Sequence, residues 1–172
     1  MTRTLFLLRH AKSSWADPTL PDHDRPLAPR GRSASKLIAD HLRREGIRPS
    51  LVLCSSSARS RETFERIAGG FSDEVEVEIE HGLYGASSAD LLERLRGVRS
   101  SVESVMLIGH LPAIQELALH LAASGEQLET LRRKFPTGAL ATLVLTGGWS
   151  RLAPGGAELV AFVKPRGLNV QW

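Results

Sequence analysis

The sequence predicts a three-layer α/β/α sandwich around a mostly parallel central sheet. Short apolar runs that end abruptly in polar residues are typical of buried strands, and the clearest are residues 4–8, 51–54 and 104–108. A segment with apolar residues at helical spacing follows each run, and alternating strands and helices favour a parallel sheet covered on both faces. The 172 residues contain no internal repeat and no linker-like stretch, so we expect a single domain over residues 1–172.

The first strand, residues 4–8, contains four consecutive apolar residues, 5–8, that stop at Arg9. A polar connection rich in Pro and Asp then covers residues 11–30, and a connection of this length inside a compact domain usually has a function. The helix that follows opens at Gly31 and places apolar residues at the spacing i, i+3, i+4 and i+8, which gives it one apolar face. Gly46 is a suitable C-terminal stop.

The second strand, residues 51–54, is followed by three serines that can cap the next helix. That helix carries Arg59 and ends before Gly69. The last residue of the strand, Cys54, is the only cysteine of the chain, and we expect a small buried residue there rather than a thiol nucleophile. A single cysteine excludes an internal disulfide and fits a reducing, cytoplasmic environment.

Two further strand–helix units complete the alternation. Val77 and Ile79 alternate with glutamates, which predicts a strand with one solvated face, and Ser87 stands three residues before Asp90 as a weak capping box for the helix after it. After the strand at 104–108, Pro112 suits the first turn of the next helix. The polar residues 123–137 predict a mobile excursion that could act as a lid. Two late strands are then expected, over residues 140–145 and 159–163.

Composition restricts the possible functions. The net charge of +3 suits an anionic substrate, but the arginines are dispersed and the chain has only five Phe, three Trp and one Tyr, which argues against nucleic-acid binding. No apolar run approaches the roughly 18 residues of a membrane span, and the N-terminal run is too short for a secretory signal. His23, His41, His81 and His120 show no metal-ligand spacing, so we expect no metal.

Cationic and imidazole side chains follow three of the predicted strands. Arg9 and His10 end the first strand, Arg59 comes shortly after the second, and His110 lies just beyond the run at 104–108. Since the carboxyl ends of parallel strands share one sheet edge, these four side chains can meet there. Arginine donors match phosphate oxygens, and a neutral histidine can attack phosphorus. The pattern therefore predicts phosphoryl-transfer chemistry.

Four motifs resemble those of the histidine phosphatase (phosphoglycerate mutase-like) superfamily. Arg9-His10-Ala11 resembles its Arg-His-Gly motif, and Pro26-Leu27-Ala28-Pro29-Arg30-Gly31 resembles its Pro-Leu-Thr-x-x-Gly motif. Residues 55–63 resemble its Ser-Pro-x-x-Arg-Ala-x-x-Thr motif. Gly109-His110-Leu111-Pro112 resembles its Gly-His-x-Pro motif. The compact size resembles the small SixA-like phosphohistidine phosphatase branch. The resemblance implies that His10 becomes transiently phosphorylated, that Arg9 and Arg59 hold the phosphoryl oxygens, and that His110 stabilises the transition state. It implies no cofactor.

Two neighbours of these residues are further candidates for substrate binding. Ser13 matches a family position that can touch phosphate, and Lys12 could screen an acidic substrate, although a solvated lysine is the alternative. Trp15 could stack on a substrate or pack under the connection. Ala11 replaces the family glycine, so we expect its backbone to stay out of the left-handed region, and Ser56 replaces proline.

The proton donor is the main departure from the family pattern. Mutase-like members carry a glutamate after the third strand, where our alignment places Gly82, and a shift of two residues would restore Glu80. Asp17, Asp22 and Asp24 in the first connection are other candidates. A site without a firm acid favours phosphohistidine as substrate, because a protonated imidazole leaves more readily than an alkoxide.

The sequence thus predicts a cytoplasmic, monomeric phosphatase. Its expected substrate is phosphohistidine in a protein or a small phosphoester. One alternative is a phosphomutase or phosphotransferase with the same site, which the short connections disfavour because they leave little lid to exclude water. Another is a phosphate-binding domain without turnover, which the presence of all four pocket residues disfavours.

Overall fold

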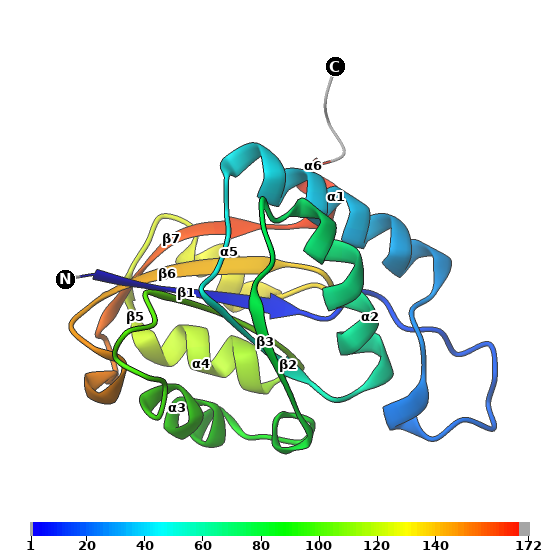
Figure 1. The fold of residues 1–172 in the computed structure, drawn as a ribbon, viewed down its shortest axis with the longest axis horizontal. Coiled ribbons are helices and arrows are strands. Elements are labelled where there is room, and N and C mark those ends of the chain that lie inside the picture. Colours follow the sequence, from blue (N-terminus) through cyan, green and yellow to red (C-terminus); the bar gives the residue numbers. More distant parts are fainter. Residues whose placement is uncertain (1, 169–172) are drawn as a thin grey trace.

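The structure is a computed structural model that describes residues 2–168. Its centre is a seven-stranded sheet in the order β3-β2-β4-β1-β6-β7-β5 (Figure 1). The strands are β1 (Thr2–Arg9), β2 (Leu51–Ser55), β3 (Glu76–Glu80), β4 (Ser104–Gly109), β5 (Ala122–Ser124), β6 (Leu140–Thr146) and β7 (Ala157–Val163). Strands β3, β2, β4 and β1 pair in parallel, β6 runs antiparallel to both β1 and β7, and β5 pairs in parallel with β7. The expected mostly parallel sheet is confirmed.

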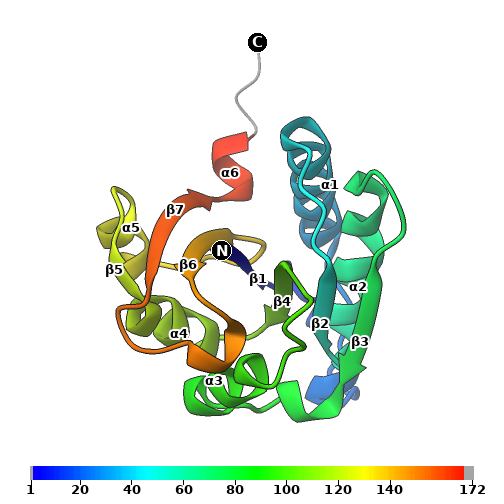
Figure 2. The same ribbon diagram turned by 60° about the vertical axis from the view of Figure 1, so that its left-hand side comes forward.

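Helices cover both faces of this sheet (Figure 2). They are α1 (Pro29–Glu45), α2 (Ala58–Ile67), α3 (Ser88–Arg96), α4 (Ala113–Leu121), α5 (Leu128–Arg133) and α6 (Pro165–Leu168). Helices α1, α2 and α6 lie on one face, and α3, α4 and α5 lie on the other. The three-layer sandwich is therefore confirmed. Among residues 2–168, no helix is both long and apolar enough to cross a membrane.

Strand β1 is the centre of the core because its side chains alternate between the two helical layers. Leu5 and Leu7 are fully buried in the cluster on the α3–α4 side, whereas Phe6 and Leu8 are buried in the cluster beneath α1 and α2. A strand covered on both faces reads as a continuous apolar run, as this one does. Each buried side chain of this size stabilises the fold by about 1.5–3 kcal/mol relative to exposure.

Local capping explains where the helices begin and end. The Ser57 side chain accepts a hydrogen bond from the Ser60 backbone and caps α2, and Ser87 and Asp90 form the predicted capping box of α3. Helix α1 ends at Gly46, whose φ of 64° is the left-handed conformation that glycine adopts at low cost. This helix starts at Pro29, two residues before the predicted start, because proline is favoured in the first turn.

The expectation of a mobile excursion over residues 123–137 is wrong. The segment contains the end of β5 and the whole of α5, and Leu131 and Phe135 are almost fully buried. The Phe135 ring packs against that of Phe162, with the centroids 5.2 Å apart. Two apolar side chains therefore anchor a segment whose other residues are mostly polar.

The face of β3 that contacts solvent is its apolar one. Strand β3 lies at the sheet edge, where Val77 is 37% exposed and Ile79 is 51% exposed. Glu78 and Glu80 point to the other face and pair with Arg94 of α3, at 2.6 and 2.7 Å. The alternation predicted the strand correctly. Its glutamates are nevertheless only partly exposed to solvent, because they form ion pairs with Arg94.

Candidate active site

The carboxyl ends of β1, β2 and β4 meet at one edge of the sheet, and a cavity of about 300 Å³ opens there. It is lined by Arg9, His10, Lys12, Ser13, Trp15, Arg25, Arg59, His110, Leu111 and Thr137. All six residues proposed from the sequence as catalytic or substrate-binding are in this lining. Four cationic side chains surround the space, which makes the cavity a site for an anion.

Backbone contacts hold the first histidine over the end of β4. The His10 amide donates to the Gly109 carbonyl at 3.1 Å, and the next amide, that of Ala11, donates to the Thr63 hydroxyl at 3.0 Å. Ala11 is fully buried, and among the described residues only glycines have positive φ. The predicted conformation at this departure from the family motif is confirmed.

The His10 ring is held in one tautomer. Its Nδ1 lies 2.7 Å from the Ala11 carbonyl, which can only accept, so Nδ1 carries the proton and Nε2 carries the lone pair. Burial, reinforced by the neighbouring His110 and by the positive charges of Arg59 and Arg9, lowers the pKa of His10 to about 3, although the hydrogen bond to Ala11 acts in the opposite direction. The ring is therefore neutral near pH 7, with one nucleophilic nitrogen.

His110 lies beside this ring, with the two centroids 5.1 Å apart. Its Nε2 is 2.7 Å from the hydroxyl of Ser55, the last residue of β2. Burial and then the charge of Arg59 lower the pKa of His110 to about 4. The cavity thus holds two neutral imidazoles among fixed positive charges.

The two arginines of the predicted motifs present donors to the cavity in different ways. Arg9 donates from Nη1 to the Phe135 carbonyl at 2.9 Å, and its buried Nε is without a hydrogen-bond partner among residues 2–168. Burial, and secondarily the charge of Arg59, lowers the pKa of Arg9. A buried donor left unsatisfied costs about 1–3 kcal/mol, so an oxyanion that supplied an acceptor would be favoured there.

Arg59 is held by a carboxylate from the first connection. It donates from Nη1 to the backbone carbonyl of Asp22 at 2.8 Å and from Nη2 to the side chain of Asp22 at 3.0 Å. The same carboxylate accepts hydrogen bonds from the Tyr84 hydroxyl at 2.6 Å and from Arg25 at 3.0 Å. These contacts, the Tyr84 hydroxyl foremost, hold the pKa of Asp22 well below its usual value. Asp22 is therefore an ionised clamp for Arg59 and a poor proton donor.

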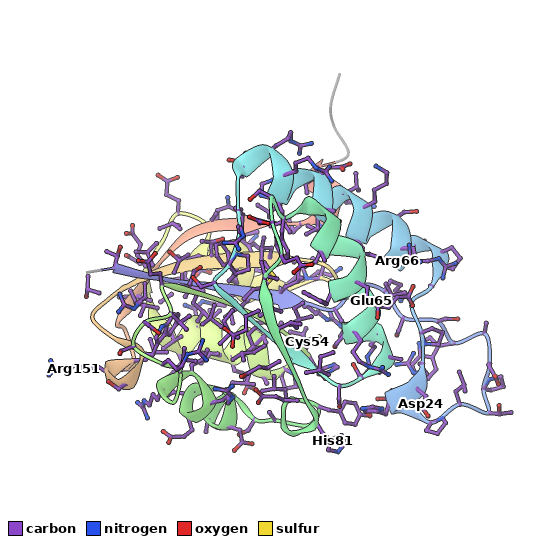
Figure 3. The ribbon with its side chains drawn as sticks, viewed as in Figure 1. Asp24, Cys54, Glu65, Arg66, His81 and Arg151 are labelled. Carbon is purple, nitrogen blue, oxygen red and sulfur yellow. The ribbon has the colours of Figure 1, made fainter. Side chains whose placement is uncertain are left out.

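The other carboxylates considered as proton donors are also engaged elsewhere. Glu80 accepts from Arg94 at 2.9 and 3.0 Å, and the Asp17 carboxylate accepts from Thr19 at 2.6 Å. Asp24 is exposed on the outer rim of the first connection, beside His23 (Figure 3). Among the described residues, those that line the cavity include no carboxylate.

Sequence reasoning missed two polar residues of the cavity. Arg25 donates to the Ser13 hydroxyl at 2.8 Å and lies 3.5 Å from the centroid of the Trp15 ring, which is 71% exposed. The alternative in which Trp15 packs under the connection is therefore wrong. Thr137 reaches the cavity because the next residue, Gly138, donates its amide to the carbonyls of Arg9 and His10. Neither residue carried a local sequence signal, because both are placed by contacts made far along the chain.

Among residues 2–168, His, Cys, Asp and Glu side chains form no group of three or more suited to a metal ion. Cys54 is fully buried, as expected, and burial raises the pKa of its thiol to about 12. The thiol is therefore protonated near pH 7 and is not a nucleophile.

We expect the rings of His10 and His110 to stay neutral as the pH is lowered from about 8 to about 5, because both pKa values lie below the ordinary 6.5. Histidine Cε1 chemical shifts measured by NMR will check this, with His10→Ala for assignment. In the unfolded chain these two histidines take up protons near pH 6.5. Their contribution to the free energy of unfolding is therefore complete above that pH and is lost as the pH falls toward 3–4. A midpoint above 6 for either ring would contradict the assignment.

Comparisons with known proteins agree with this geometry. A model of the histidine phosphatase superfamily (branch 1) matches residues 5–91. An uncharacterized protein of Mycobacterium tuberculosis is 36% identical over 163 residues, covering 92% of this chain and 100% of the relative. Another, a chloroplastic protein of Arabidopsis thaliana, is 32% identical and covers 96% of this chain and 79% of the relative.

Solved structures are similar over nearly the whole chain. The putative phosphohistidine phosphatase SixA from Nakamurella multipartitia has a TM-score of 0.84 and 31% identity, and covers 96% of this chain and 97% of its own. The putative phosphohistidine phosphatase SixA from Agrobacterium tumefaciens has a TM-score of 0.80 and 32% identity, with coverage of 95% and 98%. The protein histidine phosphatase SixA complexed with tungstate has a TM-score of 0.73 and 25% identity, with coverage of 96% and 99%.

Proposed function

The chain belongs to the histidine phosphatase superfamily and is a histidine-nucleophile phosphatase, and we propose that it uses His10 to hydrolyse phosphohistidine in a protein substrate. The observation that carries the proposal is the neutral His10 ring, whose lone pair on Nε2 lies in a cationic cavity with no carboxylic acid in its described lining. Such a site can attack phosphorus and neutralise phosphoryl oxygens, but it offers little help to a poor leaving group.

In the first step, Nε2 of His10 attacks the phosphorus of a substrate phosphohistidine whose distal ring nitrogen is protonated. The new N–P bond forms as the substrate N–P bond breaks, and the substrate histidine leaves as a neutral imidazole. The phosphorylated His10 ring keeps its proton on Nδ1, which donates a hydrogen bond to the Ala11 carbonyl. No proton has to be supplied from outside the two rings.

In the second step, water attacks the phosphorus of phosphorylated His10 from the side opposite to the N–P bond that breaks. One proton of the water passes to a phosphoryl oxygen, the His10 ring leaves as a neutral imidazole, and the product departs as H2PO4−. His110, whose Nε2 is engaged by the Ser55 hydroxyl, can donate a hydrogen bond from Nδ1–H to a phosphoryl oxygen, because its ring lies beside that of His10. Arg9 and Arg59 hold the phosphoryl oxygens in both steps, and the clamp by Asp22 positions Arg59.

The proposal predicts a clear order of substrates. We expect a phosphohistidine peptide to be hydrolysed fastest, p-nitrophenyl phosphate more slowly, and a phosphoserine peptide at least about 100-fold more slowly than the first, because an alkoxide needs a general acid. Initial rates measured side by side on one enzyme preparation will test the order. Equal turnover of the phosphoserine and phosphohistidine peptides would overturn the proposal.

Replacement of Glu80 distinguishes this mechanism from one in which Glu80 is the glutamate proton donor of the mutase-like members. The Glu80→Gln variant should keep kcat within about threefold of the original, because its carboxylate is bound by Arg94 and does not line the cavity. Steady-state kinetics on p-nitrophenyl phosphate, with a melting curve to check the fold, will measure this. A loss of tenfold or more without loss of fold would identify Glu80 as the missing acid.

A further inference from the structure

A second, smaller hollow adjoins the active-site cavity on the far side of His110. Its volume is about 160 Å³, and it shares His110 and Leu111 with the catalytic lining. The two spaces are therefore neighbours, with His110 and Leu111 as a shared wall. The parts of a substrate that extend from the phosphoryl group past His110 come close to this hollow.

The chemistry of the hollow is opposite to that of the cavity. Its walls come from the turn after β3 and the first turns of α3 and α4, and they include the buried side chains of Leu83 and Leu91 together with Ala113. Apart from His110, each residue in its described lining is apolar or glycine. One side of the active site thus binds an anion and the other favours apolar surface.

The size of the hollow restricts its occupant to a single side chain. An apolar cavity of about 150 Å³ is large enough to bind benzene. The volume here therefore suits a side chain such as that of leucine or phenylalanine, and it is too small for a helix or strand of a partner. In a polypeptide substrate, residues one or two positions from the phosphorylated one can reach it, because neighbouring Cα atoms are only about 3.8 Å apart.

We propose that this hollow is a specificity subsite that takes an apolar side chain adjacent to the phosphohistidine of a polypeptide substrate. The inference rests on the proposed function and adds a sequence preference to it. Burial of one such side chain is expected to raise kcat/KM by at least about tenfold over alanine, since a single methylene in an apolar pocket discriminates by about 10–200-fold.

The test compares phosphohistidine peptides that carry leucine or alanine at each position within two residues of the phosphorylated histidine. At one position we expect the unmodified protein to favour leucine by about tenfold in kcat/KM. Equal rates at every position would overturn the subsite while leaving the proposed function intact. If neither kind of peptide is hydrolysed although phosphoramidate is, the proposed function fails together with the subsite.

A filling variant tests the location of the preference. Ala86 lines the hollow and packs against the buried residues around it, so leucine at this position adds apolar volume to the hollow. Ala86→Leu should therefore reduce the leucine-to-alanine ratio from about ten to about one. Ala89→Leu is the matched control, since Ala89 is exposed on α3 and does not line the hollow, and its ratio should stay near ten. A ratio that remains near ten in Ala86→Leu would place the preference elsewhere and overturn the proposal. The peptide comparison needs no variant, so it stands even where Ala86→Leu does not fold.

Discussion

Replacing His10 by alanine is expected to abolish phosphatase turnover, with kcat reduced by at least about 10⁴-fold. The Nε2 lone pair of His10 is the nucleophile of the proposed mechanism, and its tautomer is fixed by the Ala11 carbonyl. His110 cannot replace it, because its own Nε2 is held by the Ser55 hydroxyl at 2.7 Å. Steady-state hydrolysis of p-nitrophenyl phosphate and of a phosphohistidine peptide will measure the loss.

Two controls distinguish the loss of the nucleophile from a general loss of structure or of phosphate binding. His120→Ala changes an exposed histidine on α4 outside the cavity lining and should keep full activity. His10→Ala itself should still bind inorganic phosphate, because Arg9 and Arg59 remain in place. More than about 1% of the original kcat in His10→Ala would show that another group attacks phosphorus.

The second large effect is expected at Arg59, where alanine should reduce kcat/KM by about 10³-fold. The substitution removes a cation from the phosphoryl site and releases the Asp22 carboxylate, which is 3.0 Å from Nη2, next to the incoming anion. Lysine should restore less than about a tenth of the original activity, because one ammonium cannot reproduce the bonds to both the backbone carbonyl and the carboxylate of Asp22 and still face the phosphoryl group.

Arg66→Ala is the matched control for that experiment. Arg66 lies on the same helix, α2, and pairs with Glu62 on its surface at 3.0 Å (Figure 3). Surface pairs of this kind contribute about 0–1 kcal/mol, so activity should change by less than about twofold. An Arg59→Ala enzyme that matches Arg66→Ala in kcat/KM would remove Arg59 from the mechanism.

The fold was predictable because its signals are local. A central strand buried on both faces must be apolar where it is covered, as residues 5–8 are, and the serine and glycine caps follow from backbone chemistry that acts within one turn. The polar segment 123–137 was misread because two buried side chains, Leu131 and Phe135, decide its structure and are outnumbered by polar neighbours. The face of β3 was not predictable because it depends on the partner Arg94.

The site was predictable where its residues directly follow strands, as His10 and His110 do. The choice among carboxylates as the acid depends on partners that are distant in sequence: Tyr84 is 62 positions from Asp22, and Arg94 is 14 from Glu80. No local pattern contains those pairings, so the sequence left the acid open. The same holds for Arg25, whose place in the cavity is set by Asp22 and Ser13.

Trapping the phosphorylated enzyme tests the central claim most directly. Turnover of a ³²P-labelled substrate is stopped by base, and the labelled peptide is mapped by mass spectrometry. We predict a label that is stable in base and lost in acid, located on His10, and absent from His10→Ala. A label on His110 or any other residue, or one that is stable in acid, would contradict the mechanism.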